Sequence, residues 1–181
     1  MVADILVRKY TKIFKLYDSN RNGYIEKADV NRMKSQYLMA FDESPTSEKG
    51  RAVSERWDAF WAALTSSLDH DQDGQVSRDE FLNGFGALAL GDSDTFDAVL
   101  RPLIETAFTL MDTDGSGSVS VAEFRRFQRA VGNGDQADAA IAQLDKDGDG
   151  MISLEELVQN AREFLTSPDL DSTGNWLLGD V

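Results

Sequence analysis

Four twelve-residue acidic segments constrain the fold of this chain more than any other feature of its sequence. They read DSNRNGYIEKAD at 18–29, DHDQDGQVSRDE at 69–80, DTDGSGSVSVAE at 112–123 and DKDGDGMISLEE at 145–156. Each has an oxygen-bearing side chain at positions 1, 3 and 5, glycine at position 6 and a β-branched aliphatic residue at position 8. Each ends in an acid at position 12. The shared spacing indicates four copies of one structural unit.

This spacing is typical of an EF-hand calcium loop. Ca²⁺ binds roughly six to eight oxygens at about 2.3–2.6 Å. Side chains at positions 1, 3 and 5 converge on one point only if the backbone wraps around the ion, and glycine at position 6 permits the sharp turn. Position 7 contributes a backbone carbonyl, and a glutamate at position 12 can reach back with both oxygens. We therefore expect up to four bound Ca²⁺ ions.

The expected metal ligands follow from these positions. In the first two loops they are Asp18, Asn20, Asn22, Tyr24 and Asp29, then Asp69, Asp71, Asp73, Gln75 and Glu80. In the last two loops they are Asp112, Asp114, Ser116, Ser118 and Glu123, then Asp145, Asp147, Asp149, Met151 and Glu156. The residues at position 9 are expected to act through water, which suits the serines found there in three of the loops.

The first loop differs from the others at position 12, where Asp29 replaces glutamate. Aspartate is one methylene shorter and reaches the ion less easily with both oxygens. A tighter cage of six oxygens suits Mg²⁺, which requires near-octahedral geometry at about 2.0–2.1 Å. We expect this loop to be the weakest for Ca²⁺ and the most tolerant of Mg²⁺. The alternative is a small helix shift that lets Asp29 chelate Ca²⁺.

Apolar residues at helical spacing flank every loop and predict amphipathic helices on both sides. The β-branched residues at position 8 suit very short strands, through which two loops can pair. The predicted fold is all-α, with four EF-hands in two paired lobes packed compactly and short β pairing between loops. We expect one pair at 1–90, the other at 91–166, and a tail at 167–181 packed on the lobes. Pro102 either starts or kinks the helix before the third loop.

Composition excludes several classes of function. With 32 acidic and 18 basic side chains the net charge is −14, which argues against nucleic acid or an anionic membrane as partner. The chain has no cysteine and a single histidine, His70, which we expect to be solvated rather than a ligand, so catalysis is not expected. Neither a signal peptide nor an apolar run of membrane-spanning length is evident, and we expect a cytoplasmic protein.

The chain resembles the sarcoplasmic calcium-binding protein family, and bacterial calerythrin-type proteins in particular. The resemblance covers four hands, a stretched first pair and a tail of the form S-P-D…G-N…G, matched here by Ser167, Pro168, Asp169, Gly174, Asn175 and Gly179. It implies a compact helical protein that buffers Ca²⁺ or Mg²⁺ in the cytosol, with the tail tucked against the lobes. Such proteins commonly have a degenerate second hand, whereas the second loop here keeps four acids, so four functional sites are expected.

Three binding functions remain open. A calcium sensor opens an apolar, usually methionine-rich groove for a target protein, whereas a buffer changes shape little. Five methionines against ten Phe, three Trp and four Tyr favour a permanently closed core, and therefore a buffer rather than a protein with a target. We also expect a monomer. Storage of an apolar ligand is the third hypothesis. It is suggested by a resemblance to luciferin-binding proteins and by Trp57, Trp61 and Trp176, which suit the lining of a cavity as well as its filling.

Overall fold

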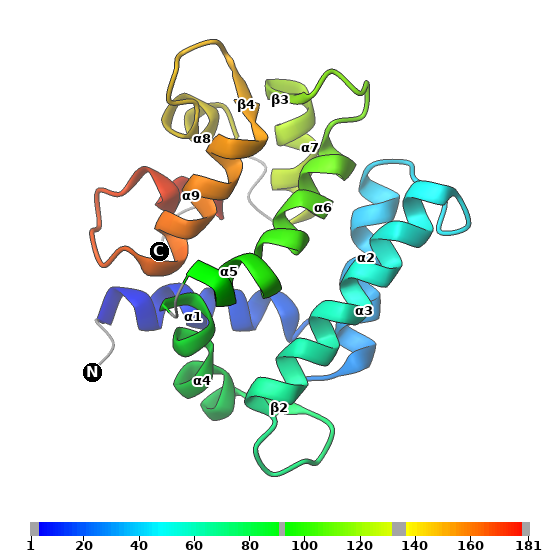
Figure 1. The fold of residues 1–181 in the computed structure, drawn as a ribbon, viewed down its shortest axis with the longest axis vertical. Coiled ribbons are helices and arrows are strands. Elements are labelled where there is room, and N and C mark those ends of the chain that lie inside the picture. Colours follow the sequence, from blue (N-terminus) through cyan, green and yellow to red (C-terminus); the bar gives the residue numbers. More distant parts are fainter. Residues whose placement is uncertain (1–3, 91–92, 132–136, 179–181) are drawn as a thin grey trace.

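Helices make up most of the structure, a computed structural model that describes residues 4–90, 93–131 and 137–178. In the first half of the chain they are α1 (Asp4–Tyr17), α2 (Lys27–Ala40), α3 (Glu48–Leu68) and α4 (Arg78–Leu90). In the second half they are α5 (Ser93–Val99), α6 (Arg101–Met111), α7 (Val121–Ala130), α8 (Ala137–Leu144), α9 (Leu154–Thr166) and the 3₁₀ helix η2 (Thr173–Leu177). Each acidic segment lies between two helices (Figure 1), which confirms the all-α prediction. Within the described ranges, every helix is too short or too polar to cross a bilayer.

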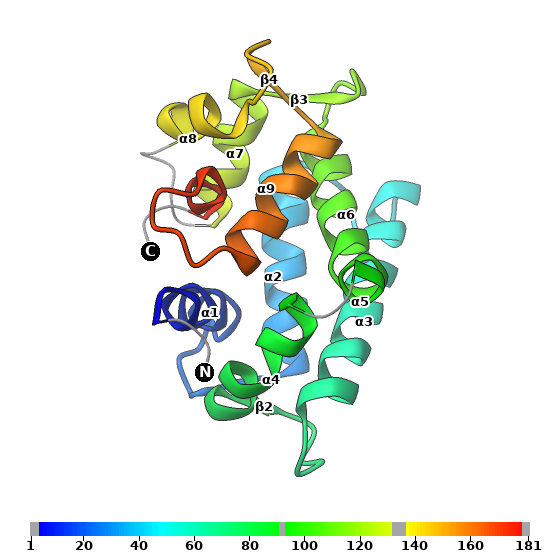
Figure 2. The same ribbon diagram turned by 60° about the vertical axis from the view of Figure 1, so that its left-hand side comes forward.

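The short strands predicted at position 8 are present and join the loops in pairs. The strands are β1 (Tyr24–Ile25), β2 (Val76–Ser77), β3 (Ser118–Ser120) and β4 (Met151–Ser153). β1 is antiparallel to β2 with Ile25 opposite Val76, and β3 is antiparallel to β4 with Val119 opposite Ile152. All four β-branched side chains are fully buried, so they pack as cross-strand pairs. Figures 1 and 2 show the two loop pairs at opposite ends of the molecule.

One hydrophobic core joins the helices of both halves of the chain. Contacts between the halves are made by α1 and α4 with α9, by α2 with α7 and by α3 with α6. The ring of Tyr37 on α2 stacks on that of Phe127 on α7, with 5.9 Å between their centroids. The apolar stripes of the helices therefore face one another rather than solvent, which agrees with the compact packing predicted from the sequence.

The side chain of Arg126 on α7 caps the C-terminal end of α2. Nε and Nη2 of Arg126 donate to the carbonyl of Ala40 at 3.1 and 2.9 Å, and Nη2 also lies 2.7 Å from Oδ2 of Asp42. The last carbonyls of a helix have no partner inside the helix, so a guanidinium placed there satisfies them and complements the helix dipole. The contact ties the helix that leaves the first loop to the helix that leaves the third.

Proline 102 starts a helix rather than kinking one. It lies in the first turn of α6, where its missing N–H would have no partner inside the helix. Its ring would clash with the carbonyl of Ala98 if α5 and α6 were continuous. The separate helix α5, which the sequence pattern did not predict, ends at Val99 for this reason.

The segment after α9 turns back and packs on α8 and α9 (Figure 2). The hydroxyl of Thr173 donates to Oε2 of Glu163 at 2.9 Å, and Nε2 of Gln128 donates to the carbonyl of Leu177 at 2.8 Å. The Leu177 side chain is buried in the core. Gly179, part of the tail pattern named above, lies outside the described residues.

Two neighbouring residues of α1 hold the C-terminal end of α9. The amine of Lys9 donates to the carbonyl of Ser167 and the hydroxyl of Tyr10 to that of Leu165, both at 2.8 Å. Both side chains are fully buried. Burial lowers the pKa of the Lys9 amine and raises the pKa of Tyr10 to about 12. A charged residue on an amphipathic helix is thus buried because it satisfies a carbonyl at a helix end.

We expect the Tyr10 phenol to make the protein less stable at alkaline pH. Because its pKa is about 12 in the folded protein and near 10 when unfolded, its contribution is present below pH 10 and is lost as the pH rises towards 12. Between pH 9 and 12, the unfolding free energy of Tyr10→Phe should therefore fall by about 2–3 kcal/mol less than that of the wild type. Urea unfolding across this range measures it. An equal fall of the unfolding free energy with pH in the variant and the wild type would contradict the raised pKa of Tyr10.

Candidate metal centre

The first acid of each loop is held by the backbone of its own loop. One carboxylate oxygen at position 1 accepts the N–H of the position-6 glycine in all four loops, at 3.0 Å for Asp18, 3.1 Å for Asp69, 3.0 Å for Asp112 and 2.8 Å for Asp145. These glycines have φ between +84° and +89°, a region that side chains with a Cβ rarely adopt. The same tight turn is therefore built four times.

Position 4 of each loop also has a left-handed backbone, which the spacing argument did not single out. Its φ is +60° at Arg21, +59° at Gln72, +70° at Gly115 and +78° at Gly148. The glycines at position 4 of the last two loops are a sequence signal for this turn. In the first two loops a residue with a side chain adopts it, at a cost of roughly 1 kcal/mol.

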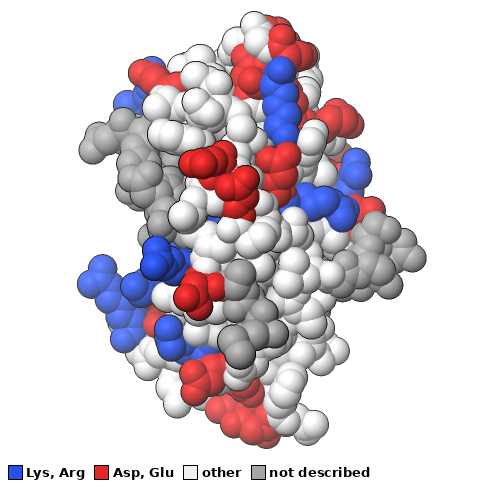
Figure 3. All heavy atoms as spheres, turned by 90° about the vertical axis from the view of Figure 1, so that its left-hand side faces the viewer, with Lys and Arg blue, Asp and Glu red and all other residues white. Residues whose placement is uncertain are grey.

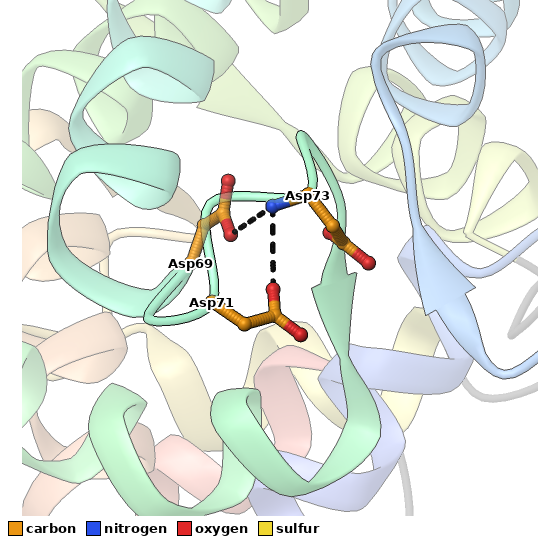
Figure 4. A group of neighbouring side chains, drawn as sticks. All are labelled: Asp69, Asp71 and Asp73. Atoms are coloured by element: carbon orange, nitrogen blue, oxygen red, sulfur yellow. Dashed lines mark hydrogen bonds between the residues drawn. The ribbon is translucent and has the colours of Figure 1, made fainter.

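Three of the loops bring carboxylates close enough together to share one ion. Candidate ligand oxygens lie within 4.8 Å of one another in the groups Asp69–Asp71–Asp73, Asp112–Asp114–Glu123 and Asp145–Asp147–Glu156. Figure 4 shows the first group, in which the N–H of Asp73 donates to the carboxylates of both Asp69 and Asp71. A ligand set of oxygens dominated by carboxylates suits a hard divalent cation. The residues of these loops therefore fit Ca²⁺.

Hydrogen bonds join positions 5 and 7 of each loop. The side-chain oxygen at position 5 accepts the N–H of position 7 in three loops, at 2.8 or 2.9 Å, in the pairs Asn22–Tyr24, Asp73–Gln75 and Asp149–Met151. In the third loop the hydroxyl of Ser116 donates to the carbonyl of Ser118 at 2.9 Å. The side chain of His70 is exposed.

The glutamates at position 12 form capping boxes with the serines at position 9. Oε2 of Glu123 accepts the N–H and the hydroxyl of Ser120 at 2.9 and 2.8 Å, while the N–H of Glu123 donates back to the serine hydroxyl. Glu80 with Ser77 and Glu156 with Ser153 repeat the arrangement. The serines, predicted to contact the ion through water, are therefore the residues that start the following helix. The box fixes the carboxylate at the edge of the loop.

The second oxygen of each glutamate reaches across its loop to position 2. Oε1 accepts a backbone N–H at 2.9 Å in the pair Glu80–His70, 2.7 Å in Glu123–Thr113 and 2.8 Å in Glu156–Lys146. Each glutamate therefore spans its loop from one side to the other.

These hydrogen bonds keep the position-12 carboxylates ionised. The hydroxyl and N–H of Ser77 lower the pKa of Glu80 to about 2. Burial acts to raise the pKa of Glu123, but hydrogen bonds from Ser120 and Thr113 outweigh it and lower the pKa to about 2. Both groups are fully charged at neutral pH and need no proton loss before they bind a cation.

Like charges crowd the fourth loop. The N–H of Asp149 acts to lower the pKa of Asp147, but desolvation and the charges of Asp149, Glu156 and Asp145 outweigh that bond, and the pKa is raised. A divalent cation among these oxygens would relieve the repulsion, so the crowding itself favours binding.

The first loop has fewer charges at its ligand positions. Asp18 and Asp29 are its carboxylates there, with the amides of Asn20 and Asn22 between them. Asp29 is fully buried, and its Oδ2 accepts the N–H of Glu26 at 3.2 Å. The first loop is absent from the three close carboxylate groups found among the described residues.

The ligand positions contain thirteen of the 32 acidic side chains, so the rest of the chain is close to neutral. Figure 3 shows one face of the molecule, with acidic side chains at its upper and lower ends and others between them. The strong negative charge of the sequence is therefore concentrated in the loops.

The family model for an EF-hand domain pair matches the chain twice, at residues 9–86 and 102–162. The chain belongs to the EF-hand family. It is 26% identical to sarcoplasmic calcium-binding protein 1 of Astacus leptodactylus, over 92% of this chain and 91% of that protein. It is 25% identical to calerythrin of Saccharopolyspora erythraea, over 91% and 94% of the two chains. A solved calcium-binding protein from Streptomyces coelicolor is 32% identical, with a TM-score of 0.79 and coverage of 91% of this chain and 99% of that one.

These relatives confirm the resemblance stated from the sequence. They are calcium-binding proteins and not enzymes. The chain is accordingly a calcium-binding protein of the EF-hand family, and three of its loops gather carboxylates that could hold a metal ion.

Proposed function

We propose that the protein is a monomeric cytoplasmic buffer of Ca²⁺, with Mg²⁺ competing most strongly at the first loop. The four binding loops belong to two EF-hand pairs. Residues 1–90 contain loops 18–29 and 69–80, and residues 91–166 contain loops 112–123 and 145–156. The tail, residues 167–181, packs on these lobes. All twenty ligands predicted from the sequence serve the four sites, and the second and fourth loops, with four carboxylates each, bind Ca²⁺ most tightly.

The closed core is the observation that supports buffering rather than sensing. A sensor exposes an apolar groove when it binds Ca²⁺, whereas here the helices of both halves bury their apolar faces against one another. Within the described residues, the exposed large apolar side chains are Val7, Tyr24, Met39, Leu90 and Leu170. They come from five separate segments, and single exposed apolar residues are ordinary on a protein surface.

Sensing is the second candidate, because the Streptomyces relative is described as a calcium-binding protein that acts in prokaryotic calcium-mediated regulation. We expect the fluorescence of a hydrophobic dye to stay constant or fall when Ca²⁺ is added to the metal-free protein, since no groove opens. Calorimetric titration of the same sample with Ca²⁺ alone, and then with Ca²⁺ over Mg²⁺, should give three tight sites and one weaker, magnesium-sensitive site. A dye signal that rises with Ca²⁺ occupancy would overturn buffering in favour of sensing.

A small apolar cavity bears on the third hypothesis, storage of an apolar ligand. Its volume is about 160 Å³, and Trp57, Leu103, Phe127 and Leu177 are among the residues that line it. Drug-sized ligands occupy pockets of roughly 300–1,000 Å³, whereas a cavity of about 150 Å³ holds a molecule the size of benzene. The other two tryptophans are not among its lining residues. The volume argues against a multi-ring ligand, and we do not propose a carrier function.

Lengthening the position-12 acid of the first loop tests the proposed division between Ca²⁺ and Mg²⁺. Asp29→Glu should strengthen Ca²⁺ binding at this loop by about tenfold and weaken the competition by Mg²⁺, because glutamate reaches the ion with both oxygens. Calorimetry with both ions measures the change. Asp79→Glu, the same change at an exposed position beside a ligand, is the matched control. Unchanged Ca²⁺ affinity at all sites of Asp29→Glu would contradict the proposal.

A further inference from the structure

The position-12 carboxylate of the first loop is occupied by side chains of the protein itself. Oδ1 of Asp29 accepts a hydrogen bond from the hydroxyl of Ser19 at 2.8 Å and another from Nη1 of Arg32 at 3.2 Å. Nη1 of Arg32 also donates to the hydroxyl of Ser19. The Asp29 side chain is completely buried, while that of Arg32 is 48% exposed. One guanidinium thus covers the acid that closes the loop.

The other three loops leave this acid without a cationic neighbour. Among the ion pairs of the described residues, none involves Glu80, Glu123 or Glu156, whose Oε1 atoms accept backbone N–H groups of position 2 instead. The third loop has an arginine at the same place in its exit helix, Arg126, but this side chain donates to Ala40. An arginine three residues after position 12 is therefore not sufficient for the contact.

The length of the acid explains the difference. Glutamate reaches the backbone N–H of position 2, and Glu123 accepts the Thr113 hydroxyl as well, whereas the shorter Asp29 bonds the side-chain hydroxyl of Ser19 instead of its N–H. Oδ1 of Asp29, one of the two oxygens that bidentate binding of an ion would need, is then available to Arg32, three residues further along the same face of α2.

We propose that Arg32 is the residue that sets the cation affinity and selectivity of the first loop, acting as a built-in positive charge that a divalent ion must displace from Asp29. The proposal rests on the proposed function, since it concerns one of the four loops. Ca²⁺ gains most when both oxygens of the closing acid are available, so the contact of Arg32 with Oδ1 of Asp29 weakens Ca²⁺ binding the most. Mg²⁺ accepts one oxygen and keeps several waters, so it binds while Arg32 retains part of its contact. Arg32 therefore shifts the loop towards Mg²⁺.

The test follows the amide resonance of Gly23 by NMR, because this N–H donates to the Asp18 carboxylate and reports the first loop by itself. Arg32→Ala should tighten Ca²⁺ binding at Gly23 by about tenfold and Mg²⁺ binding by about threefold. The magnitude follows from removing one unit charge a few ångströms from a divalent ion. Arg56→Ala, the same substitution on the exposed face of α3, should change either affinity less than twofold.

Two further measurements separate competition from a structural role. In an Asp29→Asn background, Arg32→Ala should tighten Ca²⁺ binding by a smaller factor than in the wild type, because the ion pair with Asp29 is already absent and only the repulsion between the guanidinium and the ion remains. The metal-free Arg32→Ala protein should melt about 3 °C or more below the wild type, since a buried carboxylate loses its counter-charge. A lower melting temperature without tighter Ca²⁺ binding at Gly23 would overturn the proposal, as would an equal effect of Arg56→Ala. Absence of Ca²⁺ binding at Gly74, Gly117 and Gly150 would instead overturn the proposed function.

Discussion

Glu156→Gln is expected to weaken Ca²⁺ binding at the fourth loop by about 100-fold. Glutamine keeps one neutral oxygen, so the site loses one charge and its bidentate ligand. This corresponds to about 3 kcal/mol of binding free energy, and the stabilisation by saturating Ca²⁺ should fall accordingly. Glutamine is also accepted at the third position of a capping box, so the bond with Ser153 is retained, whereas its amide NH₂ cannot accept the N–H of Lys146. The unfolding free energy without metal should therefore fall by about 1 kcal/mol, the usual contribution of one hydrogen bond.

The neighbouring residue provides the control. Glu155 is exposed on the same helix turn, and Glu155→Gln removes the same charge without removing a ligand. Calorimetry should give this variant Ca²⁺ affinities within about twofold of the wild type, because an exposed charge near a site acts weakly through water. Equal losses in the two variants would show that net charge, and not the ligand at position 12, governs binding. A large loss of metal-free stability in Glu156→Gln would show that the capping box fails with glutamine.

Gly174→Ala is expected to destabilise the protein by about 2–3 kcal/mol. A methyl group at Gly174 would lie 2.5 Å from the carbonyl oxygen of Asn160 and 2.6 Å from the backbone nitrogen of Phe164. Both atoms belong to the backbone of α9, which cannot move without breaking helix hydrogen bonds, so the tail must shift instead. The shift sacrifices the burial of Leu177 and its hydrogen bond from Gln128. Thermal unfolding should show a melting temperature about 5–10 °C lower.

Leu170→Ala is the control for this variant within the same tail. Leu170 is 67% exposed, so its truncation should change the unfolding free energy by less than about 0.5 kcal/mol. If Gly174→Ala melted with the wild type, the close approach of the tail to α9 would not contribute to stability. Gel filtration at the same time checks that the displaced tail does not cause association.

Local spacing is enough to predict the loops and their pairing. The turn at Gly150, the closing acid Glu156 and the buried pair of Val119 with Ile152 each depend on residues within one segment, or on two copies of one pattern. The position-4 glycines, Gly115 and Gly148, are a further signal in the sequence for the left-handed turn. The capping role of Ser120 was also predictable, because serine followed three residues later by glutamate is itself a helix-start pattern.

The contacts between segments distant in the chain were not predictable in this way. Nothing near Lys9 in the sequence indicates that its amine is buried against Ser167, 158 residues away. The same holds for Arg126 and Ala40, which lie 86 residues apart. Both pairs satisfy carbonyls at helix ends, and which end a cation reaches depends on how the helices cross. The break between α5 and α6 at Pro102 lies between these cases, since the sequence locates the proline but allows it either to start a helix or to kink one.

The sequence by itself determined the four EF-hand loops, because the predicted ligands of each lie within twelve consecutive residues and the backbone between them has few ways to bring their oxygens together. Only the tertiary structure decided how the loops differ and how they are joined. Arg32 covers Asp29 while Arg126, at the same place after the third loop, turns to α2. The physical reason is that a long cationic side chain binds whichever unsatisfied oxygen the packing of the helices brings within its reach.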